Sequence, residues 1–118
     1  MLLVDDDPDL LDAVRRGLVR LGYQVDTASN GLDAVRRLEE SLPEVMILDI
    51  VMPVRDGIET LMELRRSSLD LKIIVVSGGG RITSMDYLGA ARLLGAHRVL
   101  EKPFTLDELD ATIREVLG

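Results

Sequence analysis

Three short, mainly apolar runs in this chain each end in charged side chains. The charged pieces are Asp5-Asp6-Asp7, Asp49 and Lys102-Pro103. Runs this short are typical of strands in a parallel sheet that is buried on both faces. Carboxylates at the ends of such strands repel one another by about 4 kcal/mol per pair, at roughly 4 Å and an effective dielectric near 20. A hard divalent cation, which prefers oxygen ligands, would relieve this repulsion.

The segments that position these residues alternate between strand-like and helix-like patterns. The sequence predicts strands at about 2–5, 23–27, 45–49, 72–76 and 98–101, and helices at about 8–21, 31–41, 57–66, 84–94 and 105–118. This alternation implies βαβ units with right-handed crossovers and helices on both faces of the sheet. In such folds ligands bind at the carboxyl ends of the strands, where the charged pieces lie.

Apolar stripes and capping residues indicate how the helices begin and which face they bury. Asp7 is expected to cap the first helix. Thr105 and Glu108 form a capping box, beside which Phe104 is expected to pack on Leu109. The inward residues of the first two helices are predicted to be Leu11, Val14, Leu18 and Leu21 in one, and Leu32, Val35 and Leu38 in the other.

Composition narrows the class of protein. A chain of 118 residues is long enough for one domain with a real core. Its net charge of −7 argues against a nucleic-acid surface, which needs lysine and arginine to neutralise phosphates. No apolar run is long enough to span a bilayer, and no secretory signal is visible. The chain has no cysteine, which fits a cytoplasmic protein.

Several motifs, in this order and on these elements, resemble a response-regulator receiver domain of two-component signalling. They are Leu3-Val4-Asp5-Asp6-Asp7-Pro8, Ile47-Leu48-Asp49 with Met52-Pro53 and Asp56-Gly57, Val76-Ser77, and Glu101-Lys102-Pro103-Phe104. The resemblance covers residues 1–118 and implies one receiver domain. The fold it implies is flavodoxin-like (βα)5, a doubly wound α/β fold whose five-stranded parallel sheet has the order 2-1-3-4-5.

The resemblance also assigns a phosphoryl acceptor and a metal site. Asp49 would receive a phosphoryl group from a histidine kinase or a histidine phosphotransfer protein. Asp5 and Asp6, with Asp49 and the backbone carbonyl of Val51, would hold Mg²⁺ or Mn²⁺. Such a protein is a phosphorylated regulatory domain that supports its own phosphorylation and dephosphorylation, and it is not an enzyme acting on other substrates.

The remaining assigned residues would respond to the phosphoryl group. Ser77 would donate a hydrogen bond to it, Lys102 would pair with it, and the peptide bond before Pro103 would be cis. The surface of the helix at 84–94, the strand at 98–101 and the last helix would then change and be recognised by a downstream protein or an attached output domain. No output domain is recognised in this sequence, so we expect a single-domain regulator or an excised module, with no membrane partner.

Two other classes of protein share part of the pattern. A haloacid-dehalogenase-like phosphatase resembles Asp5-x-Asp7 after a first strand, but it has Thr or Val where this chain has Asp9. A receiver-like module that is never phosphorylated would be favoured by loss of an acidic residue or the lysine, and none is lost. His97 has no visible partner in the sequence and is assigned no role.

One position departs from the family pattern. Many receivers carry an aromatic residue three positions before the lysine, and this chain has Val99 there. A short β-branched side chain has no ring to swing and little rotamer freedom. Gly78-Gly79-Gly80 follows Ser77 and accepts many backbone angles. The hypothesis is therefore that activation rearranges residues 77–90.

Overall fold

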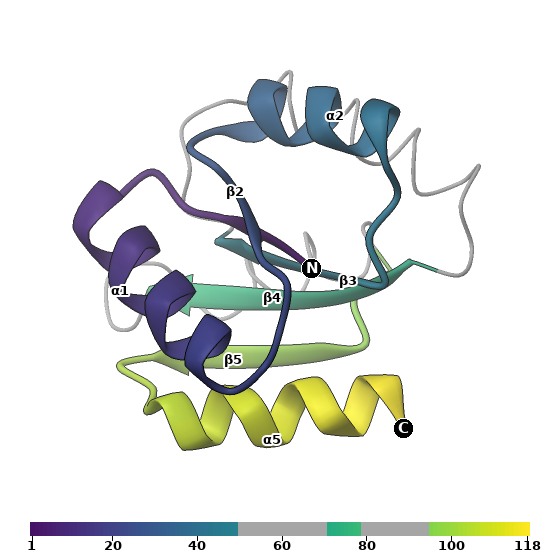
Figure 1. Ribbon diagram of the computed structural model, residues 1–118. Coiled ribbons are helices and arrows are strands. Elements are labelled where there is room, and N and C mark those ends of the chain that lie inside the picture. The colour runs from purple at the N-terminus through teal and green to yellow at the C-terminus, as the bar shows by residue number, and fades with distance from the viewer. Residues whose placement is uncertain (50–70, 79–94) are drawn as a thin grey trace.

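Five parallel strands form the centre of the protein. The computed structural model describes residues 1–49, 71–78 and 95–118. The strands are β1 (Leu2–Val4), β2 (Asp26–Ala28), β3 (Val45–Asp49), β4 (Lys72–Gly78) and β5 (Arg98–Lys102). The described helices are α1 (Pro8–Arg20), α2 (Gly31–Glu40) and α5 (Leu106–Leu117) (Figure 1). The strand order is β2-β1-β3-β4-β5, and every neighbouring pair is parallel, which confirms the predicted topology.

Helices cover both faces of the sheet. α2 lies over one face, while α1 and α5 lie over the other (Figure 1). Alternate residues of a strand point to opposite faces, so β1, β3 and β4 each contribute to two apolar clusters. The cluster under α2 includes Leu2, Val4, Met46, Leu48, Ile73 and Val75, with Ala34, Val35 and Leu38. The cluster under α1 and α5 includes Leu3, Ile47, Ile74 and Val76, with Leu18, Leu109 and Ile113.

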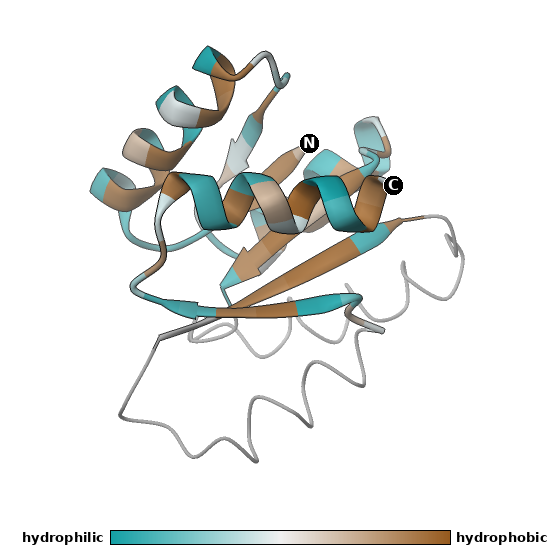
Figure 2. Cartoon of the chain, turned by 90° about the horizontal axis from the view of Figure 1, so that it is seen from below, coloured by the Kyte–Doolittle hydropathy of each residue, from teal (hydrophilic) through white to brown (hydrophobic). Residues whose placement is uncertain are grey.

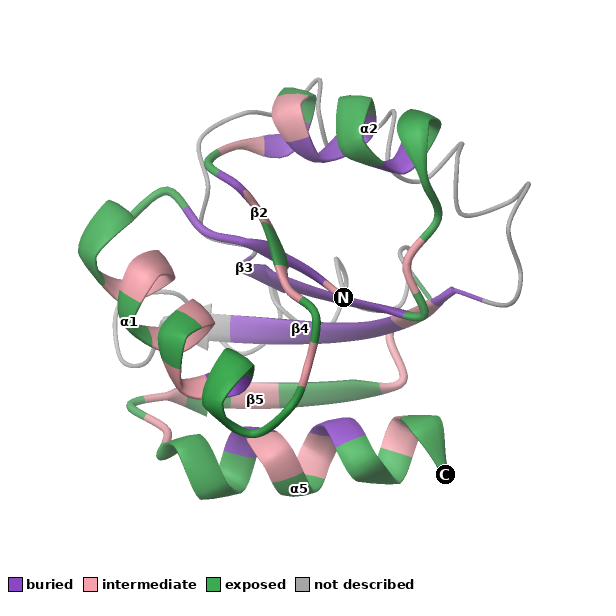
Figure 3. Ribbon diagram, viewed as in Figure 1, coloured by how far each residue is buried: buried purple, intermediate pink, exposed green. Residues whose placement is uncertain are grey.

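Burial differs between the centre and the edge of the sheet. Every residue of β1 and β3 is buried, as expected for strands covered on both faces (Figure 3). β5 lies at the edge, and Val99 in it is 43% exposed. The expectation that the run at 98–101 is buried on both faces is therefore wrong, because an edge strand has a neighbour on one side only.

The described helices are amphipathic and begin at side-chain caps. Asp7 accepts hydrogen bonds from the backbone N–H groups of Asp9 (3.1 Å) and Leu10 (3.3 Å), as predicted. The capping box of Thr105 and Glu108 is present and starts α5. Apolar and polar residues alternate along α5, which ends at the C label in Figure 2. None of the helices in the described ranges is long and apolar enough to cross a bilayer.

Several sequence predictions need correction. β2 begins at Asp26 instead of residue 23, because its ladder starts where Asp26 lies opposite Leu2. Leu21 is 46% exposed, since α1 ends at the preceding residue. Leu32 is 57% exposed, because the buried stripe of α2 follows residues 31, 34, 35 and 38 and Leu32 lies to one side of it. The helices predicted at 57–66 and 84–94 lie outside the described residues.

A polar contact joins the segment before β2 to α5. The Tyr23 hydroxyl donates a hydrogen bond to Asp110 Oδ1 (2.6 Å), and the other oxygen of Asp110 pairs with Arg114 Nε (3.2 Å). The bond to the Asp110 carboxylate is the main cause that raises the pKa of the Tyr23 phenol, and burial adds to it. The folded state therefore favours the neutral phenol.

We predict that this contact stabilises the protein at neutral pH and that its contribution disappears in alkali. A raised folded-state pKa means that the contribution is complete below the unfolded pKa of about 10 and is lost as pH rises through the folded value. Tyr23→Phe should lower the free energy of unfolding by roughly 0.5–1 kcal/mol, because Tyr23 is only half-buried. Urea unfolding at pH 7 and pH 11 measures both effects.

The phenol can also be titrated directly by tyrosinate absorbance, because the chain has no tryptophan and only two tyrosines. In the Tyr87→Phe background the remaining signal belongs to Tyr23. Asp110→Asn keeps an acceptor and removes the charge, so it should return the pKa of Tyr23 toward its ordinary value. An ordinary pKa in the protein that retains Asp110 would contradict the prediction.

Candidate functional site

The carboxyl ends of three strands bring an ammonium group between two carboxylates. Asp5 follows β1, Asp49 ends β3, and Lys102 ends β5. Lys102 Nζ lies 2.9 Å from Asp49 Oδ2 and 3.2 Å from Asp5 Oδ2. The parallel sheet places all three ends at one edge, and the long lysine side chain spans the distance that β4 leaves between β5 and β3. The side chains predicted to meet therefore do meet, although the resemblance did not pair Lys102 with Asp5.

Asp5 is a buried carboxylate that is bonded on both oxygens. Its side chain is 8% exposed, and besides Lys102 at Oδ2 it accepts the backbone N–H of Asp7 at Oδ1 (2.9 Å). Burial raises the pKa of Asp5, and the charge of Asp49 raises it further; the hydrogen bonds from Asp7 and Lys102 offset only part of this rise. The site thus disfavours negative charge on Asp5 unless more positive charge is added.

Lys102 is held in its charged form. Burial alone would lower the pKa of its ammonium, but the hydrogen bonds and charges of Asp49 and Asp5 outweigh burial and raise that pKa. Lys102 is therefore a fixed positive charge at neutral pH, and it contacts the strand-end carboxylate of Asp49 directly.

Three carboxylates at this edge fit a divalent cation. Asp5, Asp6 and Asp49 each offer an oxygen, and these oxygens lie within 4.8 Å of one another. Asp5 and Asp49 are buried and Asp6 is exposed, so the cluster opens to solvent on the Asp6 side. Three carboxylates against one ammonium leave two negative charges, and carboxylate oxygens are the ligands that Mg²⁺ and Mn²⁺ accept.

Apolar side chains surround a small cavity beside Asp5 and Asp49. Leu10, Leu11, Val14 and Phe104 line, with Asp5 and Asp49, a cavity of about 10 Å³. That volume is close to the minimum needed for one water molecule.

The other assigned residues are described in part. The Lys102–Pro103 peptide bond is cis. The backbone of Ser77 lies in β4 opposite Glu101, while its side chain is outside the described part of the structure. Val51 and the segment 79–90 of the proposed activation change lie outside the described residues.

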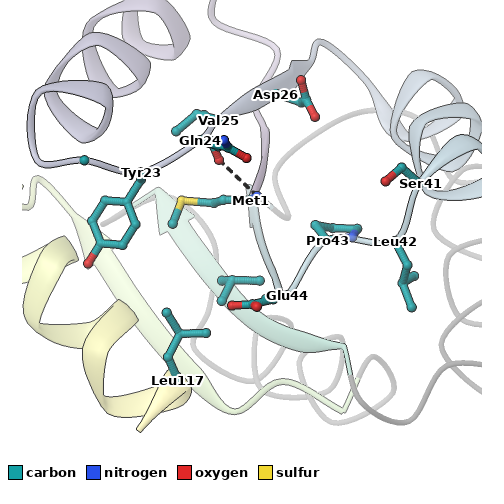
Figure 4. Close-up of a pocket in the computed structure, with 12 residues that line it drawn as sticks. Met1, Tyr23, Gln24, Val25, Asp26, Ser41, Leu42, Pro43, Glu44 and Leu117 are labelled. Carbon is teal, nitrogen blue, oxygen red and sulfur yellow. Dashed lines mark hydrogen bonds between the residues drawn. The ribbon is translucent and has the colours of Figure 1, made fainter.

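A larger hollow lies at the opposite end of the sheet. It has a volume of about 660 Å³ and is bordered by the start of β1, the segment before β2 and the segment before β3. Figure 4 shows Met1 at its centre, where the terminal amine donates to the carbonyl of Gln24 (3.1 Å). The hollow surrounds the amino-terminal ends of the strands and lies away from Asp49.

His97 has a role that the sequence analysis missed. Its Nδ1 accepts the backbone N–H of Ile73 (3.2 Å), and its own N–H donates to the Ile73 carbonyl (2.8 Å). The structure thus gives His97 a partner that the sequence did not reveal. The sequence offered one indication, which is that His97 directly precedes β5 and follows a turn at Gly95. Its partner, Ile73, lies 24 residues away on β4.

Comparison with known proteins identifies the family. The family model for the response regulator receiver domain matches residues 1–114. The transcriptional regulatory protein PrrA of Mycobacterium leprae is 39% identical over 117 residues, which cover 99% of this chain and 49% of that protein. The response regulator MprA of the same species is 36% identical over 121 residues, covering 99% and 50%. The chain thus spans about half the length of the curated relatives it matches.

Solved structures give the same result. The receiver domain of NtrX from Brucella abortus superposes with a TM-score of 0.84 and 31% identity, covering 98% of this chain and 96% of that one. A CheY-like receiver domain protein from Methanospirillum hungatei has a TM-score of 0.87 and 28% identity, covering 98% and 90%. With its sheet order and strand-end cluster, the chain belongs to the receiver domain family of two-component response regulators.

Proposed function

We propose that residues 1–118 form a phosphoacceptor switch in which Asp49 receives a phosphoryl group from a histidine kinase or a histidine phosphotransfer protein. The observation that supports this most directly is the 2.9 Å contact between Lys102 Nζ and the buried Asp49 carboxylate, beside two further carboxylates. A lone strand-end acid needs no such surroundings. A phosphoryl acceptor needs positive charge on one side and a metal ligand set on the other.

The proposed transfer is a displacement at phosphorus. An oxygen of Asp49 forms a bond to phosphorus as the P–N bond of the donor phosphohistidine breaks, and the departing imidazole keeps the bonding electrons and takes up a proton. When bound by Asp5, Asp6, Asp49 and the Val51 carbonyl, Mg²⁺ or Mn²⁺ would supply positive charge for the phosphoryl oxygens. Lys102 moves its hydrogen bond from Asp49 to a phosphoryl oxygen, and Ser77 donates a second one.

The new group changes the charge balance of the site. The phosphoryl group carries about −1.5 to −2 charge and replaces the single negative charge of the Asp49 carboxylate, at the place where Lys102 now pairs with two carboxylates. Drawing Lys102 and Ser77 toward that charge pulls on β5 and on the segment after β4. We propose that the surface formed by residues 84–94, β5 and α5 changes as a result, and that the same site later supports hydrolysis of the acyl phosphate.

The partners follow from this role. The donor is a histidine kinase or phosphotransfer protein, and the reader is a downstream protein or an attached output domain. The name of the relative PrrA, a transcriptional regulatory protein, supports a transcriptional output for a longer protein that contains such a domain. We place the signalling reaction in the cytoplasm, in keeping with the absence of cysteine.

The acceptor assignment predicts a single labelled residue. With acetyl phosphate and Mg²⁺, intact mass spectrometry should show one added phosphoryl group, and Asp49→Asn should abolish it because the amide cannot act as the nucleophile. Asp26→Asn is the matched control, because Asp26 is an exposed acid at the other end of the sheet and should label normally. If neither acetyl phosphate nor a phosphorylated kinase labels the wild type, the chain is a receiver-like module that is never phosphorylated.

The metal assignment predicts a stability gain that depends on Asp6. At ten times its dissociation constant, a ligand of the folded state adds about 1.4 kcal/mol, or roughly 4–6 °C in melting temperature for a domain of this size. Asp6→Ala should lose most of that gain and melt slightly higher without metal, because one repelling charge is gone. Asp7→Asn removes a neighbouring charge yet keeps the helix cap, so its Mg²⁺ response should equal that of the wild type. Equal responses in all three proteins would refute the metal site.

The ammonium contact predicts an exchange between lysine and metal. Lys102→Met leaves two buried carboxylates without their cation, so the metal-free protein should lose about 1–3 kcal/mol of unfolding free energy. Mg²⁺ should restore part of this loss, because it neutralises the same groups, while labelling of Asp49 should remain slow. Lys72→Met changes the only other lysine and should leave both properties unaltered. Thermal melts with and without Mg²⁺ compare the variants, and equal melting temperatures would rule out the charge contact.

A further inference from the structure

The strand that carries Lys102 has few internal constraints on its register. β5 is an edge strand, and Arg98, Val99 and Glu101 in it are exposed. Register is set firmly where one face of a strand is buried, and weakly where burial is small. Yet the pairing must place Gly78 opposite Lys102 for the ammonium to reach Asp49. Leu100 is the one residue of β5 that packs against a core cluster, so bonds at the ends of the strand can also contribute to this register.

His97 supplies such a constraint at the opposite end of the strand. The carbonyl and the N–H of Ile73 both bond to this one residue, the first to its backbone N–H (2.8 Å) and the second to its Nδ1 (3.2 Å). Gly95, two residues before His97, lies in the left-handed region (φ 66°), so the backbone turns there. The imidazole thus provides an acceptor for a backbone N–H whose residue is fully buried.

We propose that His97 is a positioning residue for Lys102: its two bonds to Ile73 set the register of β5 on β4, and that register delivers the ammonium to Asp49. The Nδ1 contact requires the neutral imidazole with its proton on Nε2. We call the two bonds between His97 and Ile73 the clamp. Protonation at Nδ1 would place two donors against each other and break the bond from the Ile73 N–H. The consequence for phosphorylation rests on the proposed function, whereas the clamp itself does not.

Charged groups lie next to this clamp. Arg98 donates to the His97 carbonyl (2.8 Å) and pairs with Glu115 of α5 (3.1 Å). Lys72 precedes Ile73 on β4. These groups are unchanged in the variants below, so differences between the variants report on the imidazole.

Two substitutions separate the hydrogen-bond acceptor of His97 from the ability of its imidazole to be protonated. His97→Asn keeps an acceptor oxygen at about the position of Nδ1 and does not titrate, and His97→Ala removes the acceptor. An unsatisfied buried N–H should raise the opening equilibrium of the Ile73 amide by about 5- to 150-fold. Native-state hydrogen exchange should show this increase in His97→Ala at pH 7 and in the wild type when His97 is protonated, but not in His97→Asn.

The chain has one histidine, so its ring signals need no assignment. Nitrogen-15 shifts should show the tautomer protonated at Nε2 at pH 7. Labelling of Asp49 by acetyl phosphate should slow severalfold in His97→Ala and keep its wild-type rate in His97→Asn.

Each outcome decides a separate part of the inference. An Nδ1-protonated tautomer, or equal Ile73 exchange in the Ala and Asn variants, overturns the clamp. If the Ile73 amide exchanges faster in His97→Ala while labelling of Asp49 is unaltered, His97 does not position Lys102 and its bonds to Ile73 are only local structural contacts. A wild-type protein that is never labelled defeats the proposed function, and the clamp is then judged by exchange and tautomer alone.

Discussion

The structure of this domain depends on how it accommodates two buried carboxylates at one edge of a sheet. Asp5 follows β1 and Asp49 ends the neighbouring strand β3, so both carboxylates are fixed by strands whose residues are all buried. Lys102 offsets the repulsion between the two carboxylates by contacting both of them. Removing one partner from a buried ionic group is far more costly than forming the group is favourable. A third strand, β5, must therefore position a cation next to the two carboxylates.

The parts of the site differ in how firmly they are held. β1 and β3 are covered on both faces, so the positions of Asp5 and Asp49 follow from the packing of the whole core. β5 has one neighbouring strand, and its contacts to the rest of the molecule come from pairing with β4, from α5 and from its two ends. The two buried carboxylates are thus held by the core, and the cation is carried by a strand at the edge of the sheet. Such a division suits a site whose occupant adds charge.

Val99 on that strand is 43% exposed. A side chain of this size neither fills an inward pocket nor blocks a surface. Movement of β5 would then have to be transmitted by the backbone and by the charged end of the strand. Family membership accounts for the sheet order, while His97 directly precedes the edge strand that carries Lys102 and Val99 lies within it.

The sequence alone determined the elements and the chemistry at their ends. Short strands, capped amphipathic helices and the acids after β1 and β3 are local patterns, and each can be recognised within a few residues of chain. The contacts that cross the sheet were decided only by the tertiary structure. The shared bond of Lys102 to Asp5 joins residues 97 positions apart, and the bond of His97 to Ile73 spans 24. The exposure of Leu32 and of β5 was missed for the same reason. Periodicity marks an apolar face, but only packing against a neighbour decides whether that face is covered.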